Sequence, residues 1–288
     1  MKYIMMSDTN ENQYTLNNPG RFSGITLHTG VRAHITIKPD RENSGITIVR
    51  NDLEHRPSAK AITDNVIDVD RATTIAVGDA RVHTVEHVLA ALYACEIDNV
   101  LIEMDGPEPP IADGSSGPYL DLIKQLGHRR QNAKRKGFRI DHPIFVKKHD
   151  STLVLLPAET YKISCTVQYG ESMMDTQYLS LPISSESFAA EIAHARTFCL
   201  HSEIEELMSK GLIRGGSLDN AVVLKNNAII CKDELRFQDE LVRHKILDVI
   251  GDLSLTGCRI QGEIIAIKPG HPTNVEMARK ISEINGKS

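Results

Sequence analysis

Residues 235–252 read Leu-Arg-Phe-Gln-Asp-Glu-Leu-Val-Arg-His-Lys-Ile-Leu-Asp-Val-Ile-Gly-Asp. At about 100° per residue, the apolar side chains of this segment and the next residue fall on one side of a helix. This apolar stripe consists of Val242, Ile246, Val249, Ile250 and Leu253. Such a stripe is typical of an amphipathic helix that packs on a core. The sequence therefore predicts a helix here, and the rest of the chain must supply the surface that it covers.

The polar side of this predicted helix carries His244, Asp248 and Asp252 at positions i, i+4 and i+8, so these side chains follow one another on one face. An imidazole and a carboxylate one turn apart can bind the same Zn²⁺ ion. An isolated pair of this kind is more often part of a solvated face. A metal site thus requires a third ligand and a base from elsewhere in the chain.

The length of 288 residues predicts two domains, and an apolar fraction of 41% is enough for packed cores. The amino terminus lacks the apolar run of a signal peptide, and no stretch is long enough to span a membrane. We therefore expect a cytoplasmic protein. The five cysteines show no Cys-x-x-Cys spacing, which indicates reduced thiols and argues against a cysteine zinc finger.

The net charge of −5 argues against a nucleic-acid binder. A local exception is a basic stretch within residues 127–137, which contains Arg129, Arg130, Lys134, Arg135 and Lys136. We interpret it as a solvated linker, with an anionic partner or a membrane surface as the alternative. Because the stretch has no apolar period, we place the domain boundary there, which gives domains at 1–130 and 131–288.

Short runs of alternating and β-branched residues predict strands in both halves, and each half has a helical segment after its strands. The predicted strands lie at 25–37, 45–49, 65–69, 99–104, 144–147, 152–156, 161–167, 221–224 and 262–268. The predicted helices lie at 85–95, 118–126, 188–196, 200–213 and 235–253. This pattern favours an α+β protein.

Two further segments contain groups that are suited to catalysis. Glu86 and His87 begin the helix at 85–95, where Thr84 is a suitable cap. A zinc hydrolase needs a carboxylate that accepts a proton from water, as Glu86 does if a metal lies beside it. His271 follows a strand and precedes Pro272, so we expect it on a loop, where it can deliver a proton or be oriented by Asp252. Ordinary surface positions explain each residue equally well when it is taken alone.

Together these segments resemble one family. Thr84-Val-Glu-His, Ala195-Arg-Thr-Phe, Gly215-Gly-Ser-Leu-Asp-Asn-Ala, the segment from Leu235 to Asp248 and Lys268-Pro-Gly-His occur in the order seen in UDP-3-O-acyl-N-acetylglucosamine deacetylases. The resemblance runs from Ser23 to Asn274. It implies two similar α+β domains, each a mainly antiparallel sheet layered on helices, with the active site between them. It also implies a small-molecule substrate, and we expect the chain to be a monomer.

The resemblance further implies a zinc ion held by His87, His244 and Asp248. Glu86 would be the general base, His271 the general acid or oxyanion partner, and Asp252 the residue that orients His271. Thr197 would donate a hydroxyl to the oxyanion. Substrate contacts would come from Phe198, Lys245 and Lys268. The apolar segment near 199–216 matches an insert that accepts the acyl chain.

The function that follows is removal of the N-acetyl group from UDP-3-O-(3-hydroxyacyl)-N-acetylglucosamine, the committed step of lipid A synthesis. A non-catalytic module that binds a nucleotide sugar or RNA is one alternative, and a zinc hydrolase for another amide or ester is the second. Three positions differ from the usual family pattern: Thr26, Gly117 and Cys199. They concern loop shape and acyl-chain fit rather than the predicted ligands.

Overall fold

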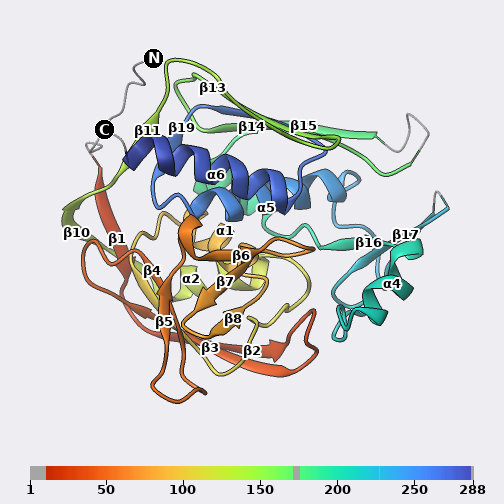
Figure 1. The fold of residues 1–288 in the computed structure, drawn as a ribbon, viewed down its shortest axis with the longest axis horizontal. Helices are drawn as coiled ribbons and strands as arrows, with labels where there is room; N and C mark the ends of the chain where they lie inside the picture. Colours follow the sequence, from red (N-terminus) through yellow and green to blue (C-terminus); the bar gives the residue numbers. More distant parts are fainter. Residues whose placement is uncertain (1–10, 171–175, 227, 287–288) are drawn as a thin grey trace.

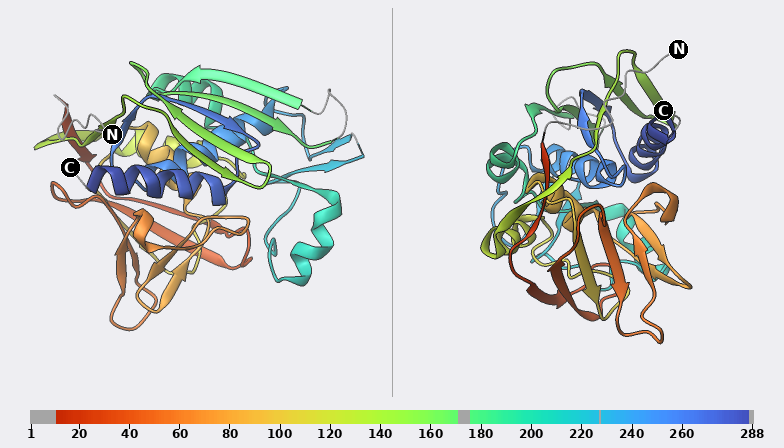
Figure 2. Two further views of the ribbon diagram at one scale, coloured as in Figure 1. Left: turned by 45° about the horizontal axis from the view of Figure 1, so that its top comes forward. Right: turned by 90° about the vertical axis from the view of Figure 1, so that its left-hand side faces the viewer.

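The protein is described by a computed structural model that covers residues 11–170, 176–226 and 228–286. Two five-stranded sheets lie on opposite sides of the molecule, and the long helices lie between them (Figures 1 and 2). The first sheet has the order β2 (Gly20–Ile25), β3 (Arg32–Pro39), β9 (Val100–Met104), β4 (Ile46–Arg50) and β5 (Ser58–Lys60). The second has the order β12 (Ile144–Lys148), β13 (Ser151–Leu156), β20 (Glu263–Ile267), β14 (Lys162–Gln168) and β15 (Thr176–Pro182).

The two sheets share one topology. In each, the third and fourth strands of the order are parallel, β9 with β4 and β20 with β14, and the other pairs are antiparallel. This confirms the predicted α+β class with two similar halves. The exact boundary at residue 130 stays a prediction.

The long helices occupy equivalent places in the two halves. They are α1 (Glu86–Ala94) and α2 (Gly117–Leu126) in the first half, and α5 (Glu240–Ser254) and α6 (His271–Gly286) in the second. Helix α1 packs against α5 at the centre of the molecule. Helix α2 contacts the first sheet and α6 the second. The contact between α1 and α5 therefore joins the two halves.

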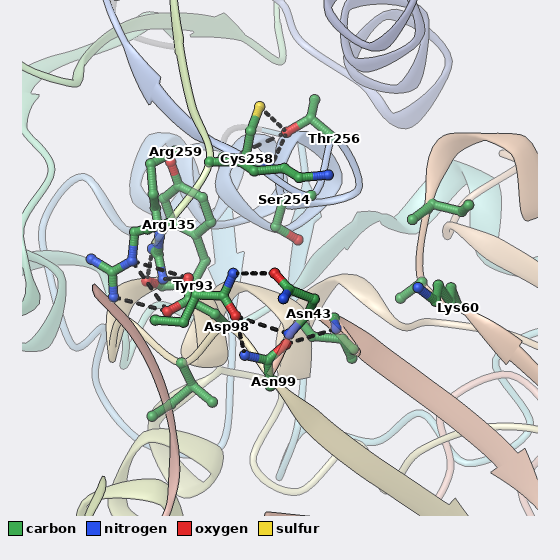
Figure 3. Close-up of a pocket in the computed structure, with 18 of the residues that line it drawn as sticks. Asn43, Lys60, Tyr93, Asp98, Asn99, Arg135, Ser254, Thr256, Cys258 and Arg259 are labelled. Carbon is green, nitrogen blue, oxygen red and sulfur yellow. Dashed lines mark hydrogen bonds and ion pairs between the residues drawn. The ribbon is translucent and has the colours of Figure 1, made fainter. Parts of the chain in front are cut away.

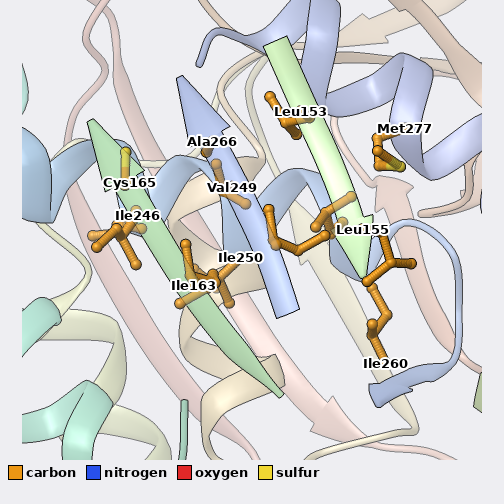
Figure 4. Packing of buried hydrophobic residues seen from close by; sticks show 14 of the residues in the cluster. Leu153, Leu155, Ile163, Cys165, Ile246, Val249, Ile250, Ile260, Ala266 and Met277 are labelled. Carbon is orange, nitrogen blue, oxygen red and sulfur yellow. The ribbon is translucent and has the colours of Figure 1, made fainter. Parts of the chain in front are cut away.

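Apolar side chains from the inner faces of the sheets fill the two cores. In the second half, β14 with Ile163 and Cys165 packs against α5, and β13 with Leu153 and Leu155 packs against α6; Figure 4 shows these side chains. Val242, Ile246, Val249, Ile250 and Leu253 are all buried, as predicted. Full burial of each such side chain contributes about 1.5–3 kcal/mol. These contacts fix the position of α5 and hence of its polar side chains.

The remaining strands form small sheets at the edges. These sheets are β1 (Asn12–Leu16) with β10 (His128–Lys134), β11 (Gly137–Arg139) with β19 (Arg259–Gln261), and β6 (Val66–Asp68), β7 (Thr74–Val77) and β8 (Ala80–Val82). The last is β16 (Phe198–Leu200), β17 (Val222–Lys225) and β18 (Ala228–Ile230). Between β16 and β17 lie a 3₁₀ turn (His201–Glu203) and α4 (Ile204–Ser209). These two elements and their sheet project from the body of the molecule (Figure 1).

Several predicted elements differ from the structure. The predicted strand at 25–37 is interrupted, because residues 26–31 form a turn between β2 and β3, in which Gly30 adopts φ +68°. Within the predicted helix at 200–213, only residues Ile204–Ser209 form an α-helix. The predicted helix at 188–196 is a short α turn (Ser185–Ser187) followed by a π-helical turn (Phe188–Ile192). Apolar spacing alone does not distinguish a long helix from these shorter turns.

The basic stretch is not a solvated linker. It forms β10, which pairs with β1, and Arg135 is buried against Asp98. Arg135 and Arg259 form ion pairs with Asp98 at the edge of a cavity of about 250 Å³, which Figure 3 shows. Arg259 also donates to the carbonyl of Tyr93 near the end of α1. We interpret this cavity as part of the seam that joins the two halves.

In the described part of the chain, no helix has the length and apolar character that a membrane crossing requires.

Candidate active site

The first turn of α1 lies directly against α5. A Cβ atom added to Gly251 would lie 2.2 Å from the carbonyl oxygen of Glu86, so only glycine permits this approach. The contact sets Glu86 and His87 beside the polar face of α5. Because α5 covers the polar side of this turn, His87 is buried although it points away from the apolar side of α1.

His87, His244 and Asp248 form one cluster. Each offers a ligand atom, and these atoms all lie within 4.8 Å of one another. The three residues are only 4%, 2% and 2% exposed. The solvated polar face that would explain His244 and Asp248 without a metal is therefore wrong.

The chemistry of these three side chains fits a metal ion. Burial lowers the pKa of His87 to about 3 and also lowers the pKa of His244, so both imidazoles are neutral, as metal ligands must be. The Nδ1 atom of His244 lies 3.0 Å from the carbonyl oxygen of Ala195. This contact makes Nδ1 the donor and leaves Nε2 as the ligand. Nδ1 of His87 is buried without a hydrogen-bond partner among the described residues.

The carboxylate of Asp248 is kept ionised. Burial alone would raise its pKa, but Lys245 and His244 hold the pKa well below its ordinary value. The Nζ atom of Lys245 donates to Oδ2 of Asp248 at 2.8 Å. Two neutral histidines and one carboxylate are a ligand set of catalytic zinc sites, which keep a further position open.

Glu86 and His271 face each other beside this cluster. Oε1 of Glu86 lies 3.9 Å from Nε2 of His271. Burial raises the pKa of Glu86 to about 8. Burial alone would lower the pKa of His271, but Asp252 and Glu86 raise it to about 9. The pair thus combines a carboxylate that takes up a proton readily with an imidazolium that can give one.

His271 is held from behind by Asp252. Its Nδ1 donates to Oδ2 of Asp252 at 2.8 Å, and Asp252 has no exposed surface. The expected loop position of His271 is wrong, since His271 is the first residue of α6. Pro272 follows it, and proline is tolerated in the first turn of a helix, where its missing N–H is not needed.

The cluster opens into a cavity of about 310 Å³ between the two halves. Three residues of the predicted site, Thr197, Phe198 and Lys245, lie in the cavity wall, together with Leu27, Val69, Asp70 and Arg71, which the sequence did not single out. Lys268 does not line this cavity, and its Nζ atom lies 3.7 Å from a carboxylate oxygen of Asp150. Asp252 does not line the cavity, but it contacts His271, which does.

The segment before α1 is held in an unusual conformation. Thr84 has φ +53°, which a β-branched residue rarely adopts. Its hydroxyl does not cap the helix as predicted but donates to Oε1 of Glu108 at 2.7 Å. Glu108 is fully buried and also accepts from the backbone N–H groups of His28 and Thr29. This buried carboxylate was missed because nothing in Gly106-Pro-Glu-Pro-Pro marks it as functional.

Gly117, one of the three positions that differ from the usual family pattern, has a local structural explanation. A Cβ atom at this position would lie 2.5 Å from the ring of His194. The neighbouring Ser116 donates its hydroxyl to the carbonyl oxygen of His87 at 2.7 Å. This turn therefore supports one of the clustered histidines.

Comparisons with known proteins point to one family. The family model described as UDP-3-O-acyl N-acetylglycosamine deacetylase matches residues 13–283. The chain is 45% identical to UDP-3-O-acyl-N-acetylglucosamine deacetylase of Chlamydia abortus over 275 residues, which cover 94% of this chain and 97% of that one. It is 44% identical to the protein of the same name from Citrifermentans bemidjiense, with coverage of 93% and 88%. The Myxococcus xanthus protein of this name is 41% identical, with coverage of 96% and 88%.

Proposed function

Because the chain belongs to the family of UDP-3-O-acyl-N-acetylglucosamine deacetylases, we propose that it hydrolyses the N-acetyl amide of UDP-3-O-(3-hydroxyacyl)-N-acetylglucosamine with a zinc ion held by His87, His244 and Asp248. The products are the free amine and acetate, and the step is the committed one of lipid A synthesis. One observation carries the assignment of the metal: the three buried ligand atoms lie within 4.8 Å of one another. We further propose that the chain works as a monomer in the cytoplasm.

Zinc, when bound, lowers the pKa of a water molecule towards about 7 and polarises a carbonyl group. Glu86 is the base that takes the proton from the attacking water. Burial raises its pKa, and the positive charge of His271 opposes that rise and favours the ionised carboxylate that a base requires. His271, whose pKa is about 9, is protonated at neutral pH and lies beside Glu86. It can donate to the amine nitrogen, because an amine leaves readily only when it is protonated.

Other side chains hold the substrate. The hydroxyl of Thr197 is a donor for the oxygen that becomes negatively charged during attack. Lys245 lies with Nζ 5.3 Å from the centre of the Phe198 ring, and both residues line the cavity. We assign them to the sugar nucleotide. Lys268 is outside the cavity wall, so we assign it only a longer-range attraction for the anionic part of the substrate.

The acyl chain is assigned to the projecting insert at 199–216. Its Gly215 contacts the loop at residues 25 and 26, where an added Cβ would lie 2.0 Å from the carbonyl oxygen of Thr26. Leu27 of this loop lines the cavity. The insert also presents the apolar side chain of Met208 to solvent, and Leu218 just after it is exposed as well. A fatty chain is the ligand group that gains most from such a surface.

The deciding experiment measures acetate release from the named substrate by purified, zinc-loaded protein. We expect turnover that a chelator abolishes. Glu86→Gln and His271→Gln should each lower kcat roughly 10²- to 10⁴-fold, the usual contribution of a general base or acid. His34→Gln is the matched control, because His34 is exposed on β3 beside Asp105. No acetate from the fully zinc-loaded wild type would refute the proposed function.

A further inference from the structure

Thr73 contacts both halves of the proposed acid and base apparatus. It precedes β7 in the first half of the chain and is fully buried. Its backbone N–H donates to Oε2 of Glu86 at 3.1 Å. Its hydroxyl donates to Oδ1 of Asp252 at 2.6 Å and lies 3.3 Å from Nδ1 of His271. A single residue therefore links the base on α1 to the acid pair on α5 and α6.

The hydroxyl of Thr73 completes the environment of Asp252. The other carboxylate oxygen, Oδ2, accepts from Nδ1 of His271 at 2.8 Å and from Nδ2 of Asn274 at 2.9 Å. A buried carboxylate is stable only if donors of this kind surround it. With one oxygen held by Thr73, the carboxylate cannot rotate without breaking that bond. Oδ2 consequently stays directed at His271.

The orientation of Asp252 decides the orientation of His271. An imidazole whose Nδ1–H is bound to a fixed acceptor presents Nε2 in one direction. In this structure Nε2 lies 3.9 Å from Glu86. The side chain of threonine is itself stiff, because two heavy atoms on Cβ restrict χ1. Thr73 is thus well suited to hold this arrangement.

We propose that Thr73 is a positioning residue, whose hydroxyl fixes Asp252 and thereby orients His271 for proton transfer to the leaving amine. This inference rests on the proposed function, in which His271 is the acid. Thr73 makes no contact with substrate in this role. Its effect is exerted through Asp252.

The test compares Thr73→Val with Thr73→Ser in the zinc-loaded protein. Valine keeps the shape and the backbone N–H but removes the hydroxyl, whereas serine restores it. We expect Thr73→Val to lower kcat roughly 10- to 100-fold, which is the effect of one charge-assisted hydrogen bond, with KM and bound zinc unchanged. Thr73→Ser should recover most of that loss. Thr74→Val is the matched control, because Thr74 is equally buried and its hydroxyl lies 3.0 Å from Nδ1 of His83 instead.

A second measurement follows the imidazole directly. In a spectrum of protein labelled with ¹⁵N-histidine, the signals of His271 should move in Thr73→Val and remain in place in Thr74→Val. The proposal is overturned if the His271 signals do not move, or if Thr73→Val and Thr74→Val lose the same activity. If the wild type released no acetate, the proposed function would fail, while this spectrum would still decide whether Thr73 orients His271.

Discussion

The carboxylate of Glu240 shows how one buried side chain joins two parts of the site. Oε1 accepts from the backbone N–H of Arg196 at 2.9 Å and from its Nε at 2.8 Å. Oε2 accepts from the backbone N–H of Arg236 at 2.9 Å. Both Glu240 and Arg196 are buried. The pair therefore fixes the start of α5 relative to Thr197 and Phe198, which follow Arg196.

This ion pair predicts a dependence of stability on pH. Burial alone would raise the pKa of Glu240, but its bonds to Arg196 lower it below the ordinary value. A carboxyl group with a lowered folded-state pKa stabilises the fold above its unfolded pKa of about 4.3. That stability is lost as the pH falls through the folded-state pKa.

Glu240→Gln should accordingly reduce the free energy of unfolding by roughly 3 kcal/mol at pH 7, because it leaves the buried guanidinium of Arg196 without its counter-charge. The difference from wild type should shrink below about pH 4. Denaturant unfolding at several pH values measures it. Glu159→Gln, which changes an exposed pair with Arg139, should stay within about 0.5 kcal/mol of wild type. An unchanged difference from pH 7 to pH 3 would contradict this explanation.

At the level of single residues, the sequence was informative where chemistry restricts the choice. His244 and Asp248 were identified by helical spacing, and His87, Glu86 and His271 by the family motifs. Thr73 and Glu108 were not identified, because a threonine and a glutamate occur in every kind of environment. Their importance depends on burial and on partners such as Asp252 and Thr84, which are distant in sequence.

At the level of elements, the contact between α1 and α5 determines the site. Gly251 lies in the interior of α5, where glycine normally costs about 1 kcal/mol relative to alanine. Glycine is nevertheless required here, because the backbone of Glu86 occupies the space that a Cβ atom would need. The close approach brings the first turn of α1 within reach of His244 and Asp248.

Gly251→Ala should therefore destabilise the protein, against the helix propensity of alanine. We expect a loss of roughly 1–3 kcal/mol in the free energy of unfolding, the range for an overpacked site, together with weaker zinc binding. Gly286→Ala is the control in α6, since nothing lies within 4 Å of an added Cβ there. Chemical denaturation measures both variants. A gain in stability for Gly251→Ala would show that α1 and α5 do not approach as described.

The sequence predicted elements well where a single period persisted, as in α5 and in β20. The prediction failed where one continuous segment of sequence contains more than one structural element. Residues 25–37 contain the end of β2, a turn and most of β3, and residues 200–213 contain a 3₁₀ turn and the short α4. Helix α6 was not predicted, because its start at Gly270-His271-Pro272 has the composition of a turn. In the structure α6 packs against α5, β12 and β13, and these tertiary contacts are not visible in its local sequence.

The whole molecule consists of two halves with the same sheet order and the same helix arrangement. Each half alone provides only part of the site. The first half contributes Glu86, His87 and Thr73, and the second half contributes the residues of α5 and α6. No repeat is visible in the sequence, because a sheet face requires only alternating apolar residues rather than particular ones. The family resemblance predicted two similar halves, and the fold shows the sheet order that they share.

The central claim is that this site binds zinc through residues from both halves, and elemental analysis of the purified protein tests it most directly. Wild-type protein should contain about one equivalent of zinc per chain. His87→Ala, from the first half, and His244→Ala, from the second, should each lose most of it while remaining folded. His34→Ala, which changes an exposed histidine, should retain it. A folded His87→Ala protein with a full equivalent of zinc would contradict the account.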